Sequence, residues 1–169
     1  MTTVALIGAP ASGKTTVGGL LARRLKVDFV DVDAEIERRQ GRRIREIFVA
    51  DGEPAFRALE HDITLELLNG PGVVSLGGGA PMNPDIVEAL AGLDTFWLQV
   101  DLANAVGRVG ADSSRPLLHG EVEATLAALI EKRTPFYRAA ARHTVATSGR
   151  TPGEVVTEIL GLLAWGQRA

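Results

Sequence analysis

Residues 8–15, Gly-Ala-Pro-Ala-Ser-Gly-Lys-Thr, carry the strongest chemical signal in this sequence. They match the pattern G-x-x-x-x-G-K-[ST] at every fixed position, and in that pattern backbone N–H groups cradle the phosphates of a nucleotide. Lys14 would reach the β- and γ-phosphates, and the Thr15 hydroxyl would coordinate Mg²⁺. The spacing therefore predicts a phosphate loop that binds a nucleoside triphosphate.

Two carboxylates, Asp31 and Asp33, stand two residues apart at the end of a predicted strand over 27–32. Alternation along a strand would place both on the same face, where two like charges are unfavourable unless a cation or a donor lies between them. Mg²⁺ for one carboxylate and a substrate hydroxyl for the other would resolve the conflict. The alternative is a pair of acidic residues that cap a helix beginning near Ala34.

A second group of side chains has the chemistry of a carboxylate-binding site. Arg57 and Glu60 lie three residues apart in a predicted helix, so their side chains share one side of it. One interpretation is a surface ion pair of little energetic value. The other is an arginine held rigid by Glu60, whose planar fork binds a carboxylate. Arg133 is a second candidate of this kind.

Three consecutive glycines, Gly77, Gly78 and Gly79, close a short apolar run and are called the glycine loop below. Each glycine costs about 0.5–1 kcal/mol of extra chain entropy when it is ordered. Residues 8–15 already provide the predicted binding site for the phosphates of a nucleotide. We therefore expect the glycine loop to serve a different ligand.

Short apolar strands alternate along the chain with longer helical patterns, and this predicts a three-layer α/β/α domain with a five-stranded parallel sheet over residues 1–169. Ligands then collect at the carboxyl ends of the strands. The predicted strands are 3–7, 27–32, 72–76, 95–100 and 143–147, and the clearest helices are 15–26, 53–69 and one that starts at Pro152.

A glycine- and serine-rich connection over residues 107–120 interrupts this alternation. We interpret about residues 110–122 as a mobile lid over the site; a floppy surface loop is the alternative.

The bulk composition narrows the classes of protein. The chain has 169 residues, 46% of them hydrophobic, which suits one globular domain. A formal net charge of −3 argues against general binding to nucleic acid or to an anionic membrane. There are no cysteines, so disulfides and thiolate metal sites are excluded, and this fits a reducing cytoplasm. The three histidines, at positions 61, 119 and 143, have no metal-site spacing.

The phosphate loop further narrows the classes of protein to which the chain could belong. The guanine-reading string N-K-x-D of GTPases does not occur in this sequence. A phosphate loop in one compact domain with a lid favours a small-molecule kinase. The acceptor of the phosphoryl group would bind in the region of about residues 33–61.

Six motifs occur together and in order: the phosphate loop, D-V-D, D-G-E-x-x-F-R-x-x-E, S-L-G-G-G, R-P-L-L and K-R-x-P-x-Y. Together they resemble the shikimate kinases over nearly the whole chain. The resemblance implies transfer of the γ-phosphoryl group of ATP to the 3-hydroxyl of shikimate, with one Mg²⁺ ion, in aromatic amino-acid biosynthesis. We expect a cytoplasmic monomer that binds ATP and shikimate and neither nucleic acid nor a membrane.

The resemblance also implies roles for individual residues. Lys14, Asp33 and Arg115 would be catalytic: Asp33 would orient the attacking hydroxyl with a carboxylate pKa near 4, and Arg115 would move with the lid onto the ATP phosphates. Asp31 would support Mg²⁺ beside Thr15. The ATP-binding residues would be Ala11, Ser12, Gly13, Lys14, Thr15, Thr16, Arg108, Arg115, Arg150 and Pro152, with Arg108 and the segment at Arg150 and Pro152 flanking adenine.

On the acceptor side, the resemblance implies that Arg57 and Arg133 clamp the shikimate carboxylate while Glu60 steadies Arg57. The glycine loop would line the pocket, with N–H groups offered by Gly78 and Gly79. An apolar wall for the ring would come from Phe48 and Phe56.

Two other functions stay open at this point. A kinase for another small acceptor, such as gluconate, would share the phosphate loop but not the two arginines or the glycine loop. A catalytically silent ATP-binding module is a rival of a different class, and the joint presence of Lys14, Thr15, Asp33 and Arg115 argues against it. Ala11 stands where a glycine is common in the family, at a position that we expect to be unconstrained.

Overall fold

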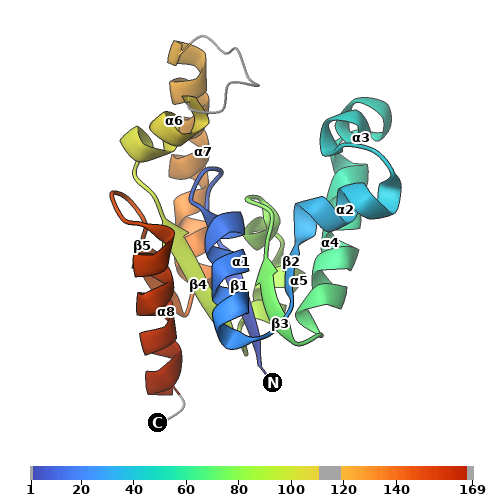
Figure 1. Ribbon diagram of the computed structural model, residues 1–169. Coiled ribbons are helices and arrows are strands. Elements are labelled where there is room, and N and C mark those ends of the chain that lie inside the picture. The colour runs from blue at the N-terminus through green and yellow to red at the C-terminus, as the bar shows by residue number, and fades with distance from the viewer. Residues whose placement is uncertain (1, 111–118, 167–169) are drawn as a thin grey trace.

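A parallel sheet forms the centre of the protein, in the strand order β2-β3-β1-β4-β5 (Figure 1). The computed structural model describes residues 2–110 and 119–166. The sheet confirms the predicted α/β class and all five predicted strands, with ends that differ by one or two residues. The strands are β1 (Thr3–Ile7), β2 (Phe29–Asp31), β3 (Gly72–Ser75), β4 (Asp94–Gln99) and β5 (His143–Ala146).

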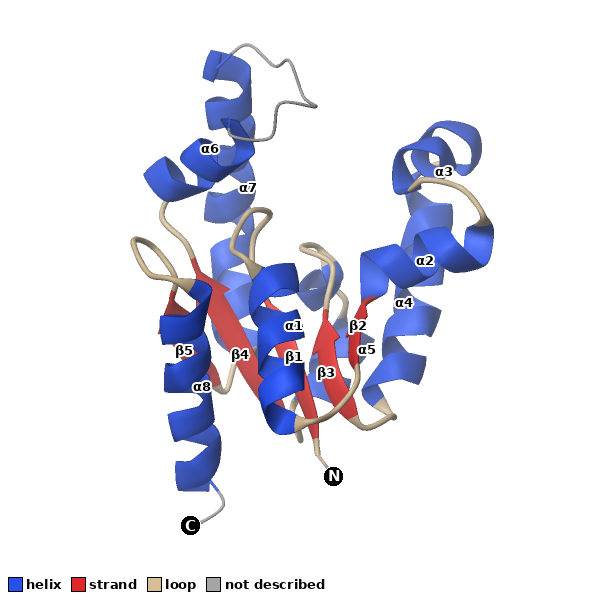
Figure 2. Cartoon of the chain, viewed as in Figure 1, coloured by secondary structure: helices blue, strands red, loops and turns tan. Residues whose placement is uncertain are grey.

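Helices cover both faces of the sheet, which confirms the three layers (Figure 2). One face carries α1 (Lys14–Leu25) and α8 (Pro152–Gly166). The opposite face carries α2 (Val32–Gln40), α3 (Ile44–Asp51), α4 (Glu53–Leu68), α5 (Pro84–Leu90) and α7 (His119–Ala140). The short 3-10 helix η1 (Ala80–Met82) follows the glycine loop, and α6 (Leu102–Gly110) precedes α7.

Alternate residues of the central strand β1 enter two separate hydrophobic cores. Val4 and Leu6 pack on the side of α1 and α8, whereas Ala5 and Ile7 pack on the side of α2, α4 and α5. All four side chains are buried. A strand that is apolar on both faces is what a covered parallel sheet requires.

The phosphate loop and the glycine loop lie side by side because β1 and β3 are neighbours in the sheet. The chain leaves β1 through α1 on one face and leaves β3 through α5 on the opposite face. Such a switch opens a crevice at the carboxyl ends of the two strands, where ligands of α/β proteins bind. The topology therefore brings two glycine-rich segments, about 60 residues apart in the sequence, to one edge of the sheet.

The local structure at Asp31 and Asp33 differs from the strand geometry predicted for them. Strand β2 ends at Asp31, the last residue that pairs with β3, and the chain turns directly into α2. Asp31 is the N-cap of α2, where its Oδ1 atom accepts the backbone N–H of Ala34 at 2.9 Å. Asp33 lies in the first turn of the helix, so alternation along a strand does not explain how the two carboxylates are placed.

Helix α8 begins as the sequence predicts, with Pro152 at its first position. The hydroxyl of Thr151 accepts the backbone N–H of Glu154 at 3.2 Å and donates to the Glu154 carboxylate at 3.1 Å. This N-cap orients the turn between β5 and α8, which carries two of the predicted adenine-binding residues, Arg150 and Pro152.

The predicted lid falls largely on residues 111–118, which lie outside the described residues, and Arg115 is among them. Its flanks are helical: Gly110 ends α6 and His119 begins α7. Across the two described ranges, the helices are too short or too polar to span a membrane.

Candidate active site

The phosphate loop holds three residues with positive φ angles. Gly8 has φ 154°, Ala11 has φ 66° and Gly13 has φ 92°. Ala11 is therefore not at an unconstrained position, as expected above: it adopts a left-handed conformation, which costs roughly 1–2 kcal/mol for a residue with a Cβ atom. Residues 10–16 line a cavity of about 470 Å³ together with Asp31, Asp33, Leu76 and Gly78.

Lys14 is one of the residues that line this cavity. Its ammonium donates to the carbonyl oxygens of Gly8 at 2.6 Å and Ala9 at 3.1 Å. Burial lowers the pKa of Lys14 to about 8, although the charges of Asp33 and Asp31 oppose the shift. A buried ammonium that is held by only two neutral acceptors is well prepared to bind an anion, because an anion would restore the solvation that burial removes.

Thr15 and Asp31, the two predicted metal-binding residues, are in contact. The Thr15 hydroxyl donates to Asp31 Oδ2 at 3.1 Å. No group of three His, Cys, Asp or Glu side chains that could hold a metal ion occurs among the described residues. A hydroxyl and one carboxylate are a suitable partial set for Mg²⁺, which keeps several waters and takes phosphate oxygens as further ligands.

Asp33 has an unusual electrostatic environment. Burial, followed by the negative charges of Asp31 and Glu60, raises the pKa of Asp33 to about 6, against the opposing charges of Lys14 and Arg57. The ordinary value near 4 expected from the sequence is therefore wrong for the protein without ligands. The sequence could not show this because the burial of Asp33 and the approach of Glu60 from α4 both arise only when the chain folds.

The three glycines of the glycine loop face three different parts of the site. A Cβ atom at Gly77 would lie 2.7 Å from Glu60 Oε2 and 2.9 Å from Asp33 Oδ1. At Gly78 it would lie 2.9 Å from Arg133 Nη1, and at Gly79 it would lie 2.6 Å from Arg57 Nη1. None of the three has a positive φ. Glycine is therefore needed for close approach of side chains and not for backbone conformation.

The two arginines meet at this loop from different helices. Arg57 on α4 donates from Nη1 to Glu60 Oε1 at 2.8 Å, and the Glu60 side chain is only 4% exposed. This geometry fits the interpretation of a rigidly held arginine better than that of a solvated surface pair. Arg133 comes from α7, and both arginines line a cavity of about 330 Å³ with Gly79, Asn83 and Lys132 among its other walls.

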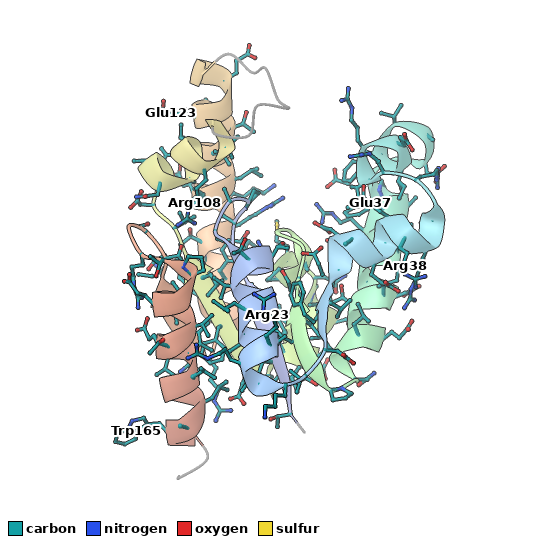
Figure 3. All side chains as sticks on the ribbon, in the orientation of Figure 1. Arg23, Glu37, Arg38, Arg108, Glu123 and Trp165 are labelled. Atoms are coloured by element: carbon teal, nitrogen blue, oxygen red, sulfur yellow. The ribbon has the colours of Figure 1, made fainter. Side chains whose placement is uncertain are left out.

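The predicted adenine-binding residues also come together. Arg108 donates to the carbonyl oxygens of Ala11 at 2.8 Å and Thr147 at 3.0 Å, and so ties α6 to the phosphate loop and to the residue that follows β5. Figure 3 labels the Arg108 side chain next to α6. Arg150 donates to the Ala146 carbonyl at 2.8 Å and pairs with Glu158 at 2.6 Å. A cavity of about 230 Å³ is lined by Arg108, Arg150 and Pro152, together with Ser12, Gly13, Thr16, Val17, Thr147 and Val155.

Phe48 and Phe56 pack against each other, with ring centroids 4.8 Å apart. Phe56 is buried, and the Arg57 guanidinium lies 5.2 Å from the centroid of its ring. Phe56 therefore packs against Arg57, and the role of the two phenylalanines as a wall for the substrate stays a prediction.

Sequence reasoning missed two residues that touch the site. Thr147 follows β5 and holds Arg108, and Tyr137 on α7 donates its hydroxyl to the Gly78 carbonyl at 2.7 Å. Only the K-R-x-P-x-Y motif pointed to Tyr137, without a role. No pattern of neighbouring residues predicts a hydrogen bond between two residues that lie 59 positions apart in the sequence.

Comparison with known proteins agrees with this geometry. A profile of the shikimate kinase family matches residues 10–164. The chain therefore belongs to the shikimate kinase family. This confirms the resemblance drawn from the six motifs, together with the predicted kinase activity toward shikimate.

Individual members of the family match along nearly the whole chain. The shikimate kinase of Thermobifida fusca is 53% identical over 88% of this chain and 87% of its own length. That of Salinispora arenicola is 46% identical over 94% of this chain and 96% of its own length. A structure of the Acinetobacter baumannii enzyme in complex with shikimate superposes with a TM-score of 0.90 at 33% identity, covering 98% of this chain and 94% of that one.

Proposed function

We propose that the protein transfers the γ-phosphoryl group of ATP to the 3-hydroxyl of shikimate in the cytoplasm, with the residue roles set out below. The proposal rests above all on the glycine loop, where Asp33, Arg57 and Arg133 approach three successive glycines beside the phosphate loop. A carboxylate that can accept a hydroxyl proton and two arginines that can bind a carboxylate suit an acceptor with a hydroxyl at one end and a carboxylate at the other.

ATP would bind with its phosphates in the 470 Å³ cavity and its adenine in the 230 Å³ cavity. Backbone N–H groups of residues 11–16 at the N-terminus of α1 and the Lys14 ammonium would hold the phosphates. Arg108 and Arg150 would flank the adenine. Arg115, outside the described residues, would add a positive charge to the phosphates.

The acceptor would lie between the glycine loop and α4. Arg57 and Arg133 would bind its carboxylate, and Glu60 would hold Arg57 in place through the 2.8 Å ion pair. Asp33 would accept a hydrogen bond from the attacking hydroxyl and orient its oxygen toward the γ-phosphorus.

In the reaction, the hydroxyl oxygen forms a bond to the γ-phosphorus while the bond to the bridging oxygen breaks and its electrons stay on ADP. The proton of the hydroxyl passes to Asp33. Such a transfer has a loose transition state, so positioning and charge neutralisation matter more than base strength. Lys14 would balance charge that moves onto the leaving phosphate.

Thr15 and Asp31 would hold Mg²⁺, Thr15 directly and Asp31 through water, and their oxygen donors 3.1 Å apart fit that ion. When bound, the ion neutralises negative charge on the phosphates. We also propose a monomer, since one chain carries every residue of the site.

A coupled assay of ADP release tests the proposal. We expect turnover that requires both shikimate and Mg²⁺, with gluconate as the rival acceptor. Arg57→Ala should raise the KM for shikimate, and Asp33→Asn should lower kcat; Arg24→Ala, on the exposed side of α1, is the matched control. Turnover with gluconate but not with shikimate would contradict the proposal.

A further inference from the structure

Tyr137 is the only tyrosine in the chain, and its side chain is buried against the active site. Its hydroxyl donates to the carbonyl oxygen of Gly78 at 2.7 Å. Arg133 lies one turn earlier on α7, and its charge opposes the rise in the pKa of this hydroxyl. A Cβ atom at Gly78 would lie 2.9 Å from Arg133 Nη1, so the arginine and the tyrosine both approach the same glycine. One buried hydroxyl therefore holds the glycine loop at the place where the proposed carboxylate-binding arginine of α7 also approaches it.

The bond to Gly78 determines more than the position of one carbonyl. The carbonyl of Gly78 and the N–H of Gly79 belong to the same peptide unit, which is planar and trans, so the two groups point in opposite directions. When Tyr137 holds the carbonyl on the side of α7, the N–H of Gly79 is aimed away from α7. The backbone hydrogen bonds of the described residues leave that N–H available to a ligand.

A loop of three glycines needs such an external restraint. Glycine has wide conformational freedom and no side chain with which to anchor itself. The carbonyls of Gly77 and Gly79 accept from Ala80 and Met82 of η1, whereas the Gly78 carbonyl accepts no backbone N–H from the described residues. Tyr137 supplies the missing bond from a distant helix.

We propose that Tyr137 is a positioning residue, which directs the Gly79 N–H toward the carboxylate of the acceptor. The inference rests on the proposed function, because it concerns the same acceptor. Tyr137 acts through the glycine loop and does not touch the reacting atoms.

The aromatic ring and the hydroxyl have separable tasks. The ring packs in the core beside Trp97 on β4, with centroids 5.9 Å apart, and so contributes to folding. Burial raises the pKa of the Tyr137 hydroxyl, which keeps it protonated as a donor. A change to phenylalanine removes the hydroxyl alone.

Tyr137→Phe is the first test, measured by steady-state kinetics with each substrate varied in turn. Loss of this buried hydrogen bond should raise the KM for shikimate about 5- to 20-fold. The KM for ATP should stay within about twofold, because the phosphate loop has its own hydrogen bonds. An unchanged KM for shikimate, or equal rises for both substrates, would overturn the inference.

Thr134→Val is the matched control, since the Thr134 hydroxyl bonds within α7 to the Ile130 carbonyl at 2.5 Å and not to the glycine loop. It should leave both KM values unchanged. If it raised the KM for shikimate as much as Tyr137→Phe does, the effect would belong to the helix and the inference would be wrong.

A second measurement keeps the aromatic ring and its hydroxyl in place and so avoids destabilising the protein. Because there is one tyrosine, growth on 3-fluorotyrosine labels this position alone. Fluorination makes the hydroxyl a stronger donor, so the KM for shikimate should fall, and the single ¹⁹F resonance should shift when shikimate is added. A ¹⁹F chemical shift that does not change when shikimate is added would refute the positioning role. Parent enzyme without activity on shikimate would instead refute the proposed function.

Discussion

Gly79→Ala separates the function of the glycine loop from the stability of the protein. The backbone of Gly79 has φ −93° and ψ −7°, which alanine adopts without strain. Its new Cβ atom would lie 2.6 Å, 2.9 Å and 3.0 Å from Nη1, Nη2 and Cζ of Arg57. Ordinary contact begins at 3.4 Å, so Nη1 must retreat by about 0.8 Å.

This small movement should weaken binding of the acceptor much more than it lowers the free energy of unfolding. Charge-assisted hydrogen bonds contribute about 1.5–3 kcal/mol each, and their loss would raise the KM for shikimate about 10- to 150-fold. The guanidinium is one-third exposed and lies outside the core, but its retreat would lengthen the 2.8 Å ion pair between Nη1 and the buried Glu60 carboxylate. That loss offsets part of any gain in folding stability. Restriction of the unfolded chain by alanine even favours folding by about 0.4–1 kcal/mol.

The assay is coupled ADP release for both KM values, together with thermal unfolding followed by circular dichroism. Gly161→Ala is the matched control, because a Cβ atom at Gly161 on α8 would meet nothing within 4 Å. It should stabilise the protein and leave both KM values unchanged. A Gly79→Ala protein with a normal KM for shikimate, or with a raised KM for ATP alone, would refute the assignment of Arg57 to the acceptor.

Two further predictions concern turnover. Gly77→Ala would place a Cβ atom 2.9 Å from Asp33 Oδ1. If Asp33 shifts by about 1 Å in response, kcat should fall about 10²-fold. A normal kcat would argue against Asp33 as the orienting group. The pH profile of kcat/KM should be bell-shaped, because Asp33 becomes protonated below its pKa of about 6 and Lys14 becomes neutral above its pKa of about 8. Activity that stays flat across both values would contradict these assignments.

Local sequence determined the parts of the protein that depend on neighbouring residues alone. The phosphate loop is a contiguous string whose glycines and lysine act within one turn, so its pattern is sufficient to identify it. Apolar runs on both faces identify the parallel strands, and Thr151 with Pro152 identifies the start of α8. The order of the six motifs was specific enough to indicate the family.

Tertiary structure decided whatever depends on groups that are distant in the chain. The end of β2 depends on its pairing with β3, so Asp33 lies in a helix and not in the strand. The raised pKa of Asp33 comes first from its burial and then from the charges of Asp31 and of Glu60 on α4. The need for three glycines becomes evident only when Asp33, Arg57 and Arg133 converge on them. The hydroxyl of Tyr137 reaches Gly78 across 59 residues, and such contacts arise from packing, which no local pattern encodes.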